Sequence, residues 1–137
     1  MTKFVITTLV VVHLVLMFWH GGAHAELHIE LSPAKNVFIY VVILTAPIVA
    51  AGLIWTRYVT MGLSLFVLSM ISAFVFSVYH HYVLISPDHV HHLPGADLAA
   101  QADFVASAAV LSMLELGSAL CGAFLLGAHR APSRTRL

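Results

Sequence analysis

Histidine is the residue type in this sequence most able to do chemistry, because neutral imidazole is a common ligand for zinc, copper and iron. The 137-residue chain contains ten histidines. Three of them, His20, His24 and His28, recur at intervals of four and would share one face of a continuous helix. Gly21-Gly22 weakens a helix at this point. An extended backbone would instead place His28 between two carboxylates, Glu26 and Glu30, on one face.

A second group of histidines is denser. His80 and His81 are adjacent, so on a helix their side chains would point about 100° apart, one inward and one outward. In Asp88-His89-Val90-His91-His92, an extended backbone would direct His89 and His91 to one side, a bidentate arrangement suited to Cu(II) or Zn. Asp88 would be a ligand or would fix a histidine tautomer. The sequence thus predicts a transition-metal site whose candidate ligands are His20, His24, His28, His80, His81, Asp88, His89, His91 and His92.

The predicted metal is copper or zinc. Imidazole combined with carboxylate suits Zn, Cu(II), Fe or Mn, whereas Cu(I) prefers thiolate and thioether ligands. Cys121 is the single cysteine, so no disulfide can form within the chain. The alternative to a metal site is a structural or pH-responsive surface of histidines that bind water or lipid head groups and titrate at about pH 6.5.

Composition indicates an integral membrane protein. The sequence is 61% hydrophobic and only 9% charged, and its mean hydropathy is +0.97. The formal net charge is zero with neutral histidine, which excludes the basic field that nucleic-acid binding requires. The predicted partners are therefore the lipid bilayer and either other membrane subunits or further copies of the chain.

Four apolar stretches predict an all-α membrane protein, a single-domain bundle of four transmembrane helices. Each of the last three stretches exceeds the roughly 20 residues that span a bilayer. We expect the shorter first stretch to be retained as a helix; the alternative is a signal peptide cleaved after Ala23-His24-Ala25. Pro47 predicts a kink in the second helix, and Asp97 a cap for the fourth. The expected helices cover residues 4–20, 33–56, 60–83 and 98–128.

Basic residues predict the orientation in the membrane. Lys3, Arg57, Arg130, Arg134 and Arg136 would share one side of a four-helix protein, and only Lys35 falls on the other. The termini are therefore expected to be cytoplasmic. The two His-rich loops, residues 20–32 and 84–97, would face outward, with the bacterial inner membrane as the expected location.

Two ionisable residues fall inside apolar stretches, where charge is costly. His13 lies in the first stretch and Glu115 in the fourth, at depths that differ by about one helical turn. The two side chains could pair directly or through water. The interpretations are a proton or ion relay from the histidine face, a structural hydrogen bond, or a contact with another subunit.

The leading functional hypothesis is a small membrane protein that binds copper or zinc for delivery, storage or transport, and that is not an enzyme by itself. The second is an accessory subunit of a respiratory, photosynthetic or oxygenase complex, whose small-residue fourth helix meets a partner. A third is a b-type haem protein that uses His20 or His13 with His80 or His81 as axial ligands.

The motifs His20-x-x-x-His24, His80-His81 and His89-x-His91-His92 resemble the histidine boxes of membrane di-iron hydroxylases and desaturases. This resemblance implies a di-metal enzyme. The chain departs from that family in the spacing of its H-x-x-H-H boxes, in its much shorter length, and in the expected side of the membrane.

Overall fold

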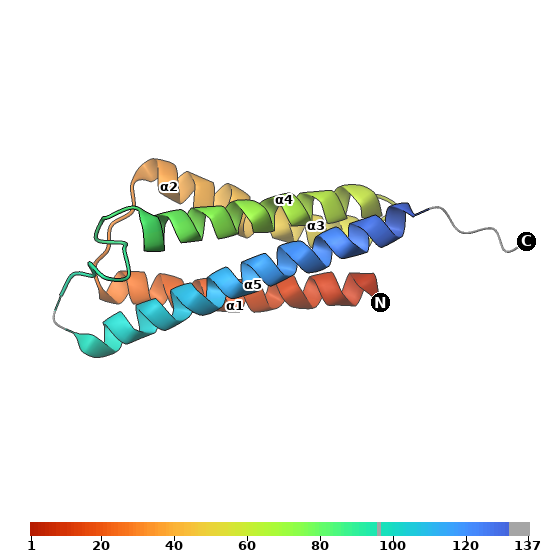
Figure 1. The fold of residues 1–137 in the computed structure, drawn as a ribbon. Coiled ribbons are helices and arrows are strands. Elements are labelled where there is room, and N and C mark those ends of the chain that lie inside the picture. Colours follow the sequence, from red (N-terminus) through yellow and green to blue (C-terminus); the bar gives the residue numbers. More distant parts are fainter. Residues whose placement is uncertain (96, 132–137) are drawn as a thin grey trace, which may run out of the picture.

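The computed structural model describes residues 1–95 and 97–131, and these form helices joined by short connections, with no strand among them (Figure 1). Four helical segments are long and apolar enough to cross a membrane. The predicted all-α architecture with four membrane-length helices is therefore confirmed. Their elements are α1 (Thr2–Glu26), then α2 (Pro33–Phe38), η1 (Ile39–Thr45) and α3 (Ala46–Ile54), then α4 (Val59–Val78) and η2 (Tyr79–Val83), and finally α5 (Leu98–Arg130).

The first helix is longer than the sequence predicts, because α1 continues through Gly21 and Gly22 to Glu26. Neither glycine is crowded, and their helical hydrogen bonds are kept. The helix ends when the backbone N–H of Leu27 bonds to Ala23 and that of Ile29 to His24. Because the helix continues through the glycines, His20 and His24 lie on one face of α1. Both side chains can therefore contribute to the same site.

Proline shapes the second membrane segment. Pro47 cannot donate a hydrogen bond to the turn before it and its ring crowds that turn, and the preceding residues widen into the π-helix η1. There the N–H of Ala46 reaches back to the Val41 carbonyl. The hydroxyl of Thr45 donates to the Tyr40 carbonyl at 2.6 Å, so the side chain adds a hydrogen bond across the wider turn. The predicted kink thus takes the form of a π-helical turn.

Packing is tightest toward the end of the molecule that carries the termini. There α4 lies between α3 and α5, and α1 packs along α5 (Figure 1). Gly62 lets α4 approach the Ala50 carbonyl of α3, and Gly122 lets α5 approach Phe66. This apolar core consists of Ile6, Val10, Ala50, Ile54, Leu63, Phe66, Met70 and Ala119.

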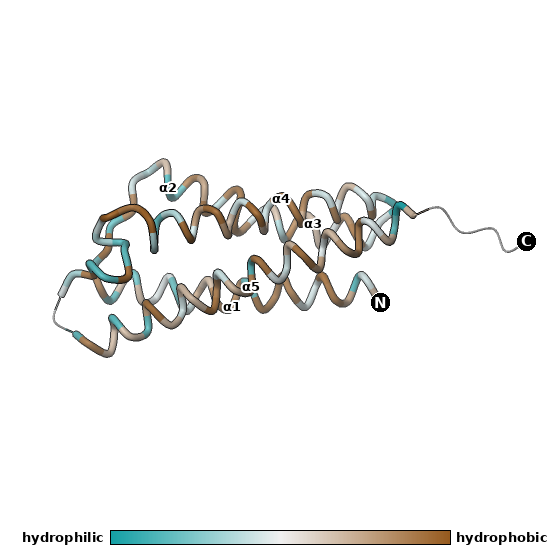
Figure 2. The backbone as a smooth tube through the Cα atoms, in the orientation of Figure 1, coloured by the Kyte–Doolittle hydropathy of each residue, from teal (hydrophilic) through white to brown (hydrophobic). Residues whose placement is uncertain are grey.

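The opposite end is more open. In Figure 1, α2 lies well apart from α1 at this end, and the loops after α1 and η2 close the molecule there. Figure 2 shows hydrophilic backbone positions concentrated at the two ends, with hydrophobic runs between them. The side chain of Asp97 caps α5 by accepting from the N–H groups of Ala99 and Ala100, as its position predicts. A cavity at this end is lined by residues of α1, η1, α4, η2 and α5, and it belongs to the candidate site.

Candidate metal centre

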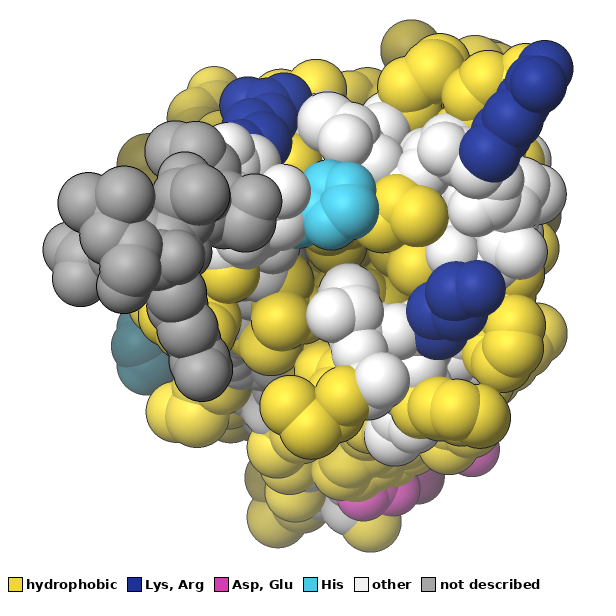
Figure 3. All heavy atoms as spheres, turned by 90° about the vertical axis from the view of Figure 1, so that its right-hand side faces the viewer, with side chains coloured by type: hydrophobic (Ala, Val, Ile, Leu, Met, Phe, Trp, Pro, Cys, Tyr) yellow, Lys and Arg dark blue, Asp and Glu magenta, His cyan; other side chains and the backbone are white. Residues whose placement is uncertain are grey.

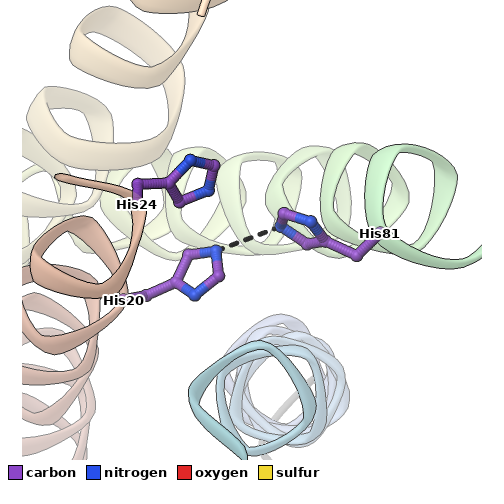
Figure 4. Close-up of side chains that lie close together, drawn as sticks. All are labelled: His20, His24 and His81. Atoms are coloured by element: carbon purple, nitrogen blue, oxygen red, sulfur yellow. Dashed lines mark hydrogen bonds between the residues drawn. The ribbon is translucent and has the colours of Figure 1, made fainter. Parts of the chain in front are cut away.

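Three histidines from two helical segments meet at the open end (Figure 4). His20 and His24 lie one helical turn apart on the same face of α1, and His81 comes from the π-helical turn η2. One ring nitrogen from each residue lies within 4.8 Å of the other two. The Nε2 atoms of His20 and His81 are only 3.1 Å apart. This triad could hold a metal ion.

The ring nitrogen of His20 that points away from His81, Nδ1, forms a hydrogen bond. Its Nδ1 lies 2.9 Å from Oγ of Ser107, and that hydroxyl lies 3.1 Å from the Phe104 carbonyl. Since the Ser107 hydroxyl donates to the carbonyl, it accepts from His20, which puts the imidazole proton on Nδ1. Nε2 of His20 therefore presents a lone pair to His81.

Asp88 contacts the rings of the other two histidines, His81 and His24. Nδ1 of His81 donates to the backbone carbonyl of Asp88 at 2.9 Å and lies 3.3 Å from its Oδ1. Nε2 of His24 lies 3.3 Å from the same Oδ1, and Nδ1 of His24 is buried without a partner. The held Nδ1 atoms of His20 and His81 leave Nε2 of each ring with a free lone pair, as in metal sites supported by outer hydrogen bonds.

At 3.1 Å, the Nε2 atoms of His20 and His81 are close enough either to share a proton in a hydrogen bond or to bind the same cation. Bonds of about 2.05 Å at a tetrahedral metal place two imidazole nitrogens about 3.4 Å apart. His20 and His81 would need to move by only a few tenths of an ångström, and the third ring nitrogen, from His24, lies within 4.8 Å of theirs. The donor set could therefore hold a small divalent ion bound by three neutral imidazoles.

The triad is shielded from water by an aromatic ring. The ring of Phe104 has its centroid 4.9 Å from those of His20 and His24 and 5.3 Å from that of His81. Only 5% of His20 and 5% of His81 is exposed. In such a dry environment a ligated cation is held more strongly than at a wet surface.

The Asp88 carboxylate supplies negative charge next to the triad. Burial alone would raise the pKa of Asp88, but the hydrogen bond from His81, the charges that His81 and His24 carry when protonated, and the charge of Lys35 outweigh it and lower the pKa to about 2. The Lys35 ammonium lies 3.5 Å from Oδ2. Asp88 is therefore ionised at neutral pH, and it can offset part of the charge of a bound cation.

All three histidines and Asp88 line a cavity of about 370 Å³ between the outer halves of α1, η1, α4 and α5. Its walls are largely apolar, and it reaches past Ser77 and Leu111 to Glu115. Catalytic and exchangeable metal sites combine three protein ligands with an open position. Here the cavity lies against the triad, so an ion bound there would be accessible to a small ligand.

The other predicted ligands lie elsewhere. His28 follows the end of α1 with a positive φ of 53°, so it neither continues the helical face nor joins an extended strip with Glu26 and Glu30. His80 packs against Phe76, with ring centroids 4.4 Å apart, on the side of η2 away from His81. Within the part of the chain that the structure describes, only His20, His24 and His81 form a group of three close ligand atoms.

The loop histidines form a separate cluster. Nδ1 of His89 accepts from the backbone N–H of His91 at 3.1 Å, and the N–H of His92 bonds to the His89 carbonyl. These turns replace the extended backbone that would direct His89 and His91 to one side. His91 and His92 are exposed. The eight clustered histidines therefore do not gather as histidine boxes do around two metals.

The haem hypothesis does not fit the contact between His20 and His81. Two axial nitrogens at about 2 Å from an iron would lie about 4 Å apart with a porphyrin between them. Their Nε2 atoms are 3.1 Å apart, and both rings touch Phe104. His13, the alternative axial ligand, already contacts another side chain, since its Nε2 lies 3.4 Å from Oε1 of Glu115.

Sequence reasoning did not single out Ser107 or Phe104. A serine inside an apolar helix is a weak signal, since serine often bonds its own backbone there. The periodicity of α5 nonetheless contains a pattern, because its buried positions include the polar residues Ser107, Ser112, Glu115 and Ser118. Comparison of the chain with protein-family models, curated proteins and solved structures found no match.

Proposed function

We propose that this protein binds one copper or zinc ion through His20, His24 and His81 and holds, delivers or transports it at the outer face of a membrane. The observation that carries the proposal is the convergence of one ring nitrogen from each of three histidines, two of which, His20 and His81, have their Nδ1 atoms held by Ser107 and by the Asp88 carbonyl. A surface of solvated histidines has no need for such support.

The distribution of charge supports an outward-facing site. Lys3, Arg57 and Arg130 lie at the end of the molecule that carries the termini, and Figure 3 shows basic side chains spread over that end. Basic residues favour the cytoplasmic side. Asp88 and the triad lie at the opposite end, so an ion would enter from outside. Arg134 and Arg136, which the topology prediction also uses, lie outside the described residues.

The adjacent residues His80 and His81 provide a matched pair of variants for testing metal binding. Purified protein loaded with Zn²⁺ or Cu²⁺ and then desalted should retain one ion per chain, measured by elemental mass spectrometry. His81→Ala should lower the affinity by more than about 100-fold, and Asp88→Asn, which leaves all three ligands in place, by about 10–100-fold. His80→Ala should leave the affinity unchanged, because His80 faces away from the triad.

Two results would overturn this function. One is the absence of stoichiometric metal from the unmodified protein under conditions in which it remains folded. The other is an equal loss of metal in the His80 and His81 variants, which would indicate non-specific binding. Retention of metal when His89, His91 and His92 are replaced together would separate the triad from the exposed loop cluster.

One observation favours an accessory-subunit role as the second candidate. The cavity beside the triad is lined by Phe18 and Tyr40, which are 79% and 64% exposed, so it opens along the side of the bundle. A helix from another membrane subunit could close it. Isolation from native membranes in a mild detergent, followed by metal analysis of whatever is retained, tests this role: the chain purifying alone with its metal would exclude it.

A further inference from the structure

A second polar pair is buried deeper in the membrane part of the molecule. Nε2 of His13, on α1, lies 3.4 Å from Oε1 of Glu115, on α5. The side chains are 0% and 1% exposed. Ionisable groups at such depth are costly to keep and commonly mark ion or proton pathways.

The pair leaves polar atoms unsatisfied. Nδ1 of His13 and Oε2 of Glu115 are buried without a hydrogen-bond partner, and so is Oγ of Ser118 one turn further along α5. Leaving a buried polar group unsatisfied is unfavourable. These atoms are therefore positions at which a proton or a water molecule could bind.

A route connects this pair to the end of the molecule that carries the triad. Glu115 lines the same cavity as the triad. Along the way, the hydroxyl groups of Ser77 and Ser112 lie 2.8 Å apart, and Ser107 contacts His20. Beyond Glu115, toward the termini, the space is filled by the apolar core that includes Val10, Phe66 and Met70. Water can therefore approach Glu115 from the triad end, while the other direction is closed.

Few other titratable groups face Glu115. Helix α1 contributes His13, η1 contributes Tyr40 through the cavity, and η2 contributes His81. Helices α3 and α4 contain no titratable side chain. The protonation of the pair is thus governed mainly by its two members and by the charge at the triad.

We propose that His13 and Glu115 form a proton-binding site in the middle of the membrane, loaded through the cavity from the end that carries the triad. A hydronium ion in the cavity gives its proton to the pair and leaves a water molecule, which removes one negative charge from the pair. This proposal does not require that the triad bind a metal.

Infrared difference spectroscopy of the full chain in lipid vesicles tests the proton itself. As the pH falls from about 9 to about 4, we expect a carbonyl stretch of a protonated carboxylic acid that is lost in Glu115→Gln, beside the signals of the exposed carboxylates, which the variant keeps. This variant keeps a hydrogen-bonding oxygen toward His13. Metal binding at the triad, measured in the same variant, should be retained, which separates this site from the proposed metal function.

Substitutions at two glycines test whether protons reach Glu115 through the cavity. Gly22 lines the cavity, and a Cβ added there meets no atom within 4 Å; Gly52, on α3, is equally uncrowded but does not line the cavity. Transfer to D₂O should shift the Glu115 band quickly in the unmodified protein and in Gly52→Phe, and more slowly in Gly22→Phe. The absence of a titrating Glu115 band would overturn the proton site. Equal exchange rates in both glycine variants would overturn the route.

Discussion

At the scale of single residues, the second nitrogen of each imidazole decides what the first can do. Ser107 and Asp88 hold the outer nitrogens of His20 and His81, so the inner nitrogens face each other as lone pairs. A histidine without such a partner would rotate to satisfy both of its nitrogens in water. The chemistry of the site therefore depends on one serine and one aspartate as much as on the three histidines.

The Asp88 carboxylate also predicts how stability depends on pH. Its pKa is about 2 in the folded protein, compared with 3.8 for the free group, so it stabilises the fold above pH 3.8 and the contribution is lost as the pH falls toward 2. Linkage puts the loss at about 2 kcal/mol. Chemical unfolding of the metal-free protein in detergent, at steps between about pH 5 and about pH 2, measures it.

Asp88→Asn is the control for this dependence. An asparagine keeps the shape of the side chain but does not titrate, so the variant should lack the part of the acid loss that Asp88 causes. Asp103→Asn, an exposed carboxylate on α5, should behave as the unmodified protein does. If the Asp88 and Asp103 variants lose stability along the same curve, the contacts of Asp88 with His81, His24 and Lys35 do not stabilise the fold.

At the scale of helices, close approach of backbones is what holds the terminal half together. Without water in the bilayer to drive apolar groups together, helices associate through tight packing at small residues. A Cβ added to Gly62 would lie 2.7 Å from Cγ1 of Ile54 and 2.8 Å from the Ala50 carbonyl oxygen. The α3–α4 contact has no room for that atom.

Gly62→Ala should therefore destabilise the protein by about 1–3 kcal/mol, because the two helices must separate to accommodate the methyl group. Thermal unfolding in detergent, followed by circular dichroism, measures this effect. The matched variant Gly52→Ala adds the same atom to open space on α3 and should be neutral or slightly stabilising. Equal stability of both variants would show that α3 and α4 do not pack at Gly62.

At the scale of the whole molecule, charge and chemistry are divided between the two ends. The described basic residues other than Lys35 lie at the end with the termini, whereas the triad, Asp88 and the loop histidines lie at the other. The apolar core closes the first end and the cavity opens the second. An asymmetric bundle of this kind exposes its site to one side of a membrane only.

Orientation is accessible to cysteine labelling in a Cys121→Ser background. His92→Cys, in the exposed loop after η2, should react with a membrane-impermeant maleimide added to intact cells. Thr56→Cys, in the exposed turn between α3 and α4, should react only after the membrane is opened. The reverse pattern would place the triad in the cytoplasm and overturn the outward-facing site.

The amino-acid sequence by itself determined the class of fold and indicated the residue type from which a candidate metal site is built. Apolar runs of membrane length predict helices because each backbone group must find its partner within the segment. The concentration of histidines predicts metal ligation. Local signals also placed the cap at Asp97 and the distortion before Pro47 correctly, since these depend on neighbouring residues only.

Only the tertiary structure decided which histidines meet. His80 and His81 are indistinguishable in the sequence, but the wide turn of η2 directs one to Phe76 and the other to His20. His28, with the same spacing as His24, lies beyond the helix end. Residue types are local properties, whereas a site is built where separate helices cross. The position of each ring therefore follows from how α1, η2 and α5 pack, which no single segment encodes.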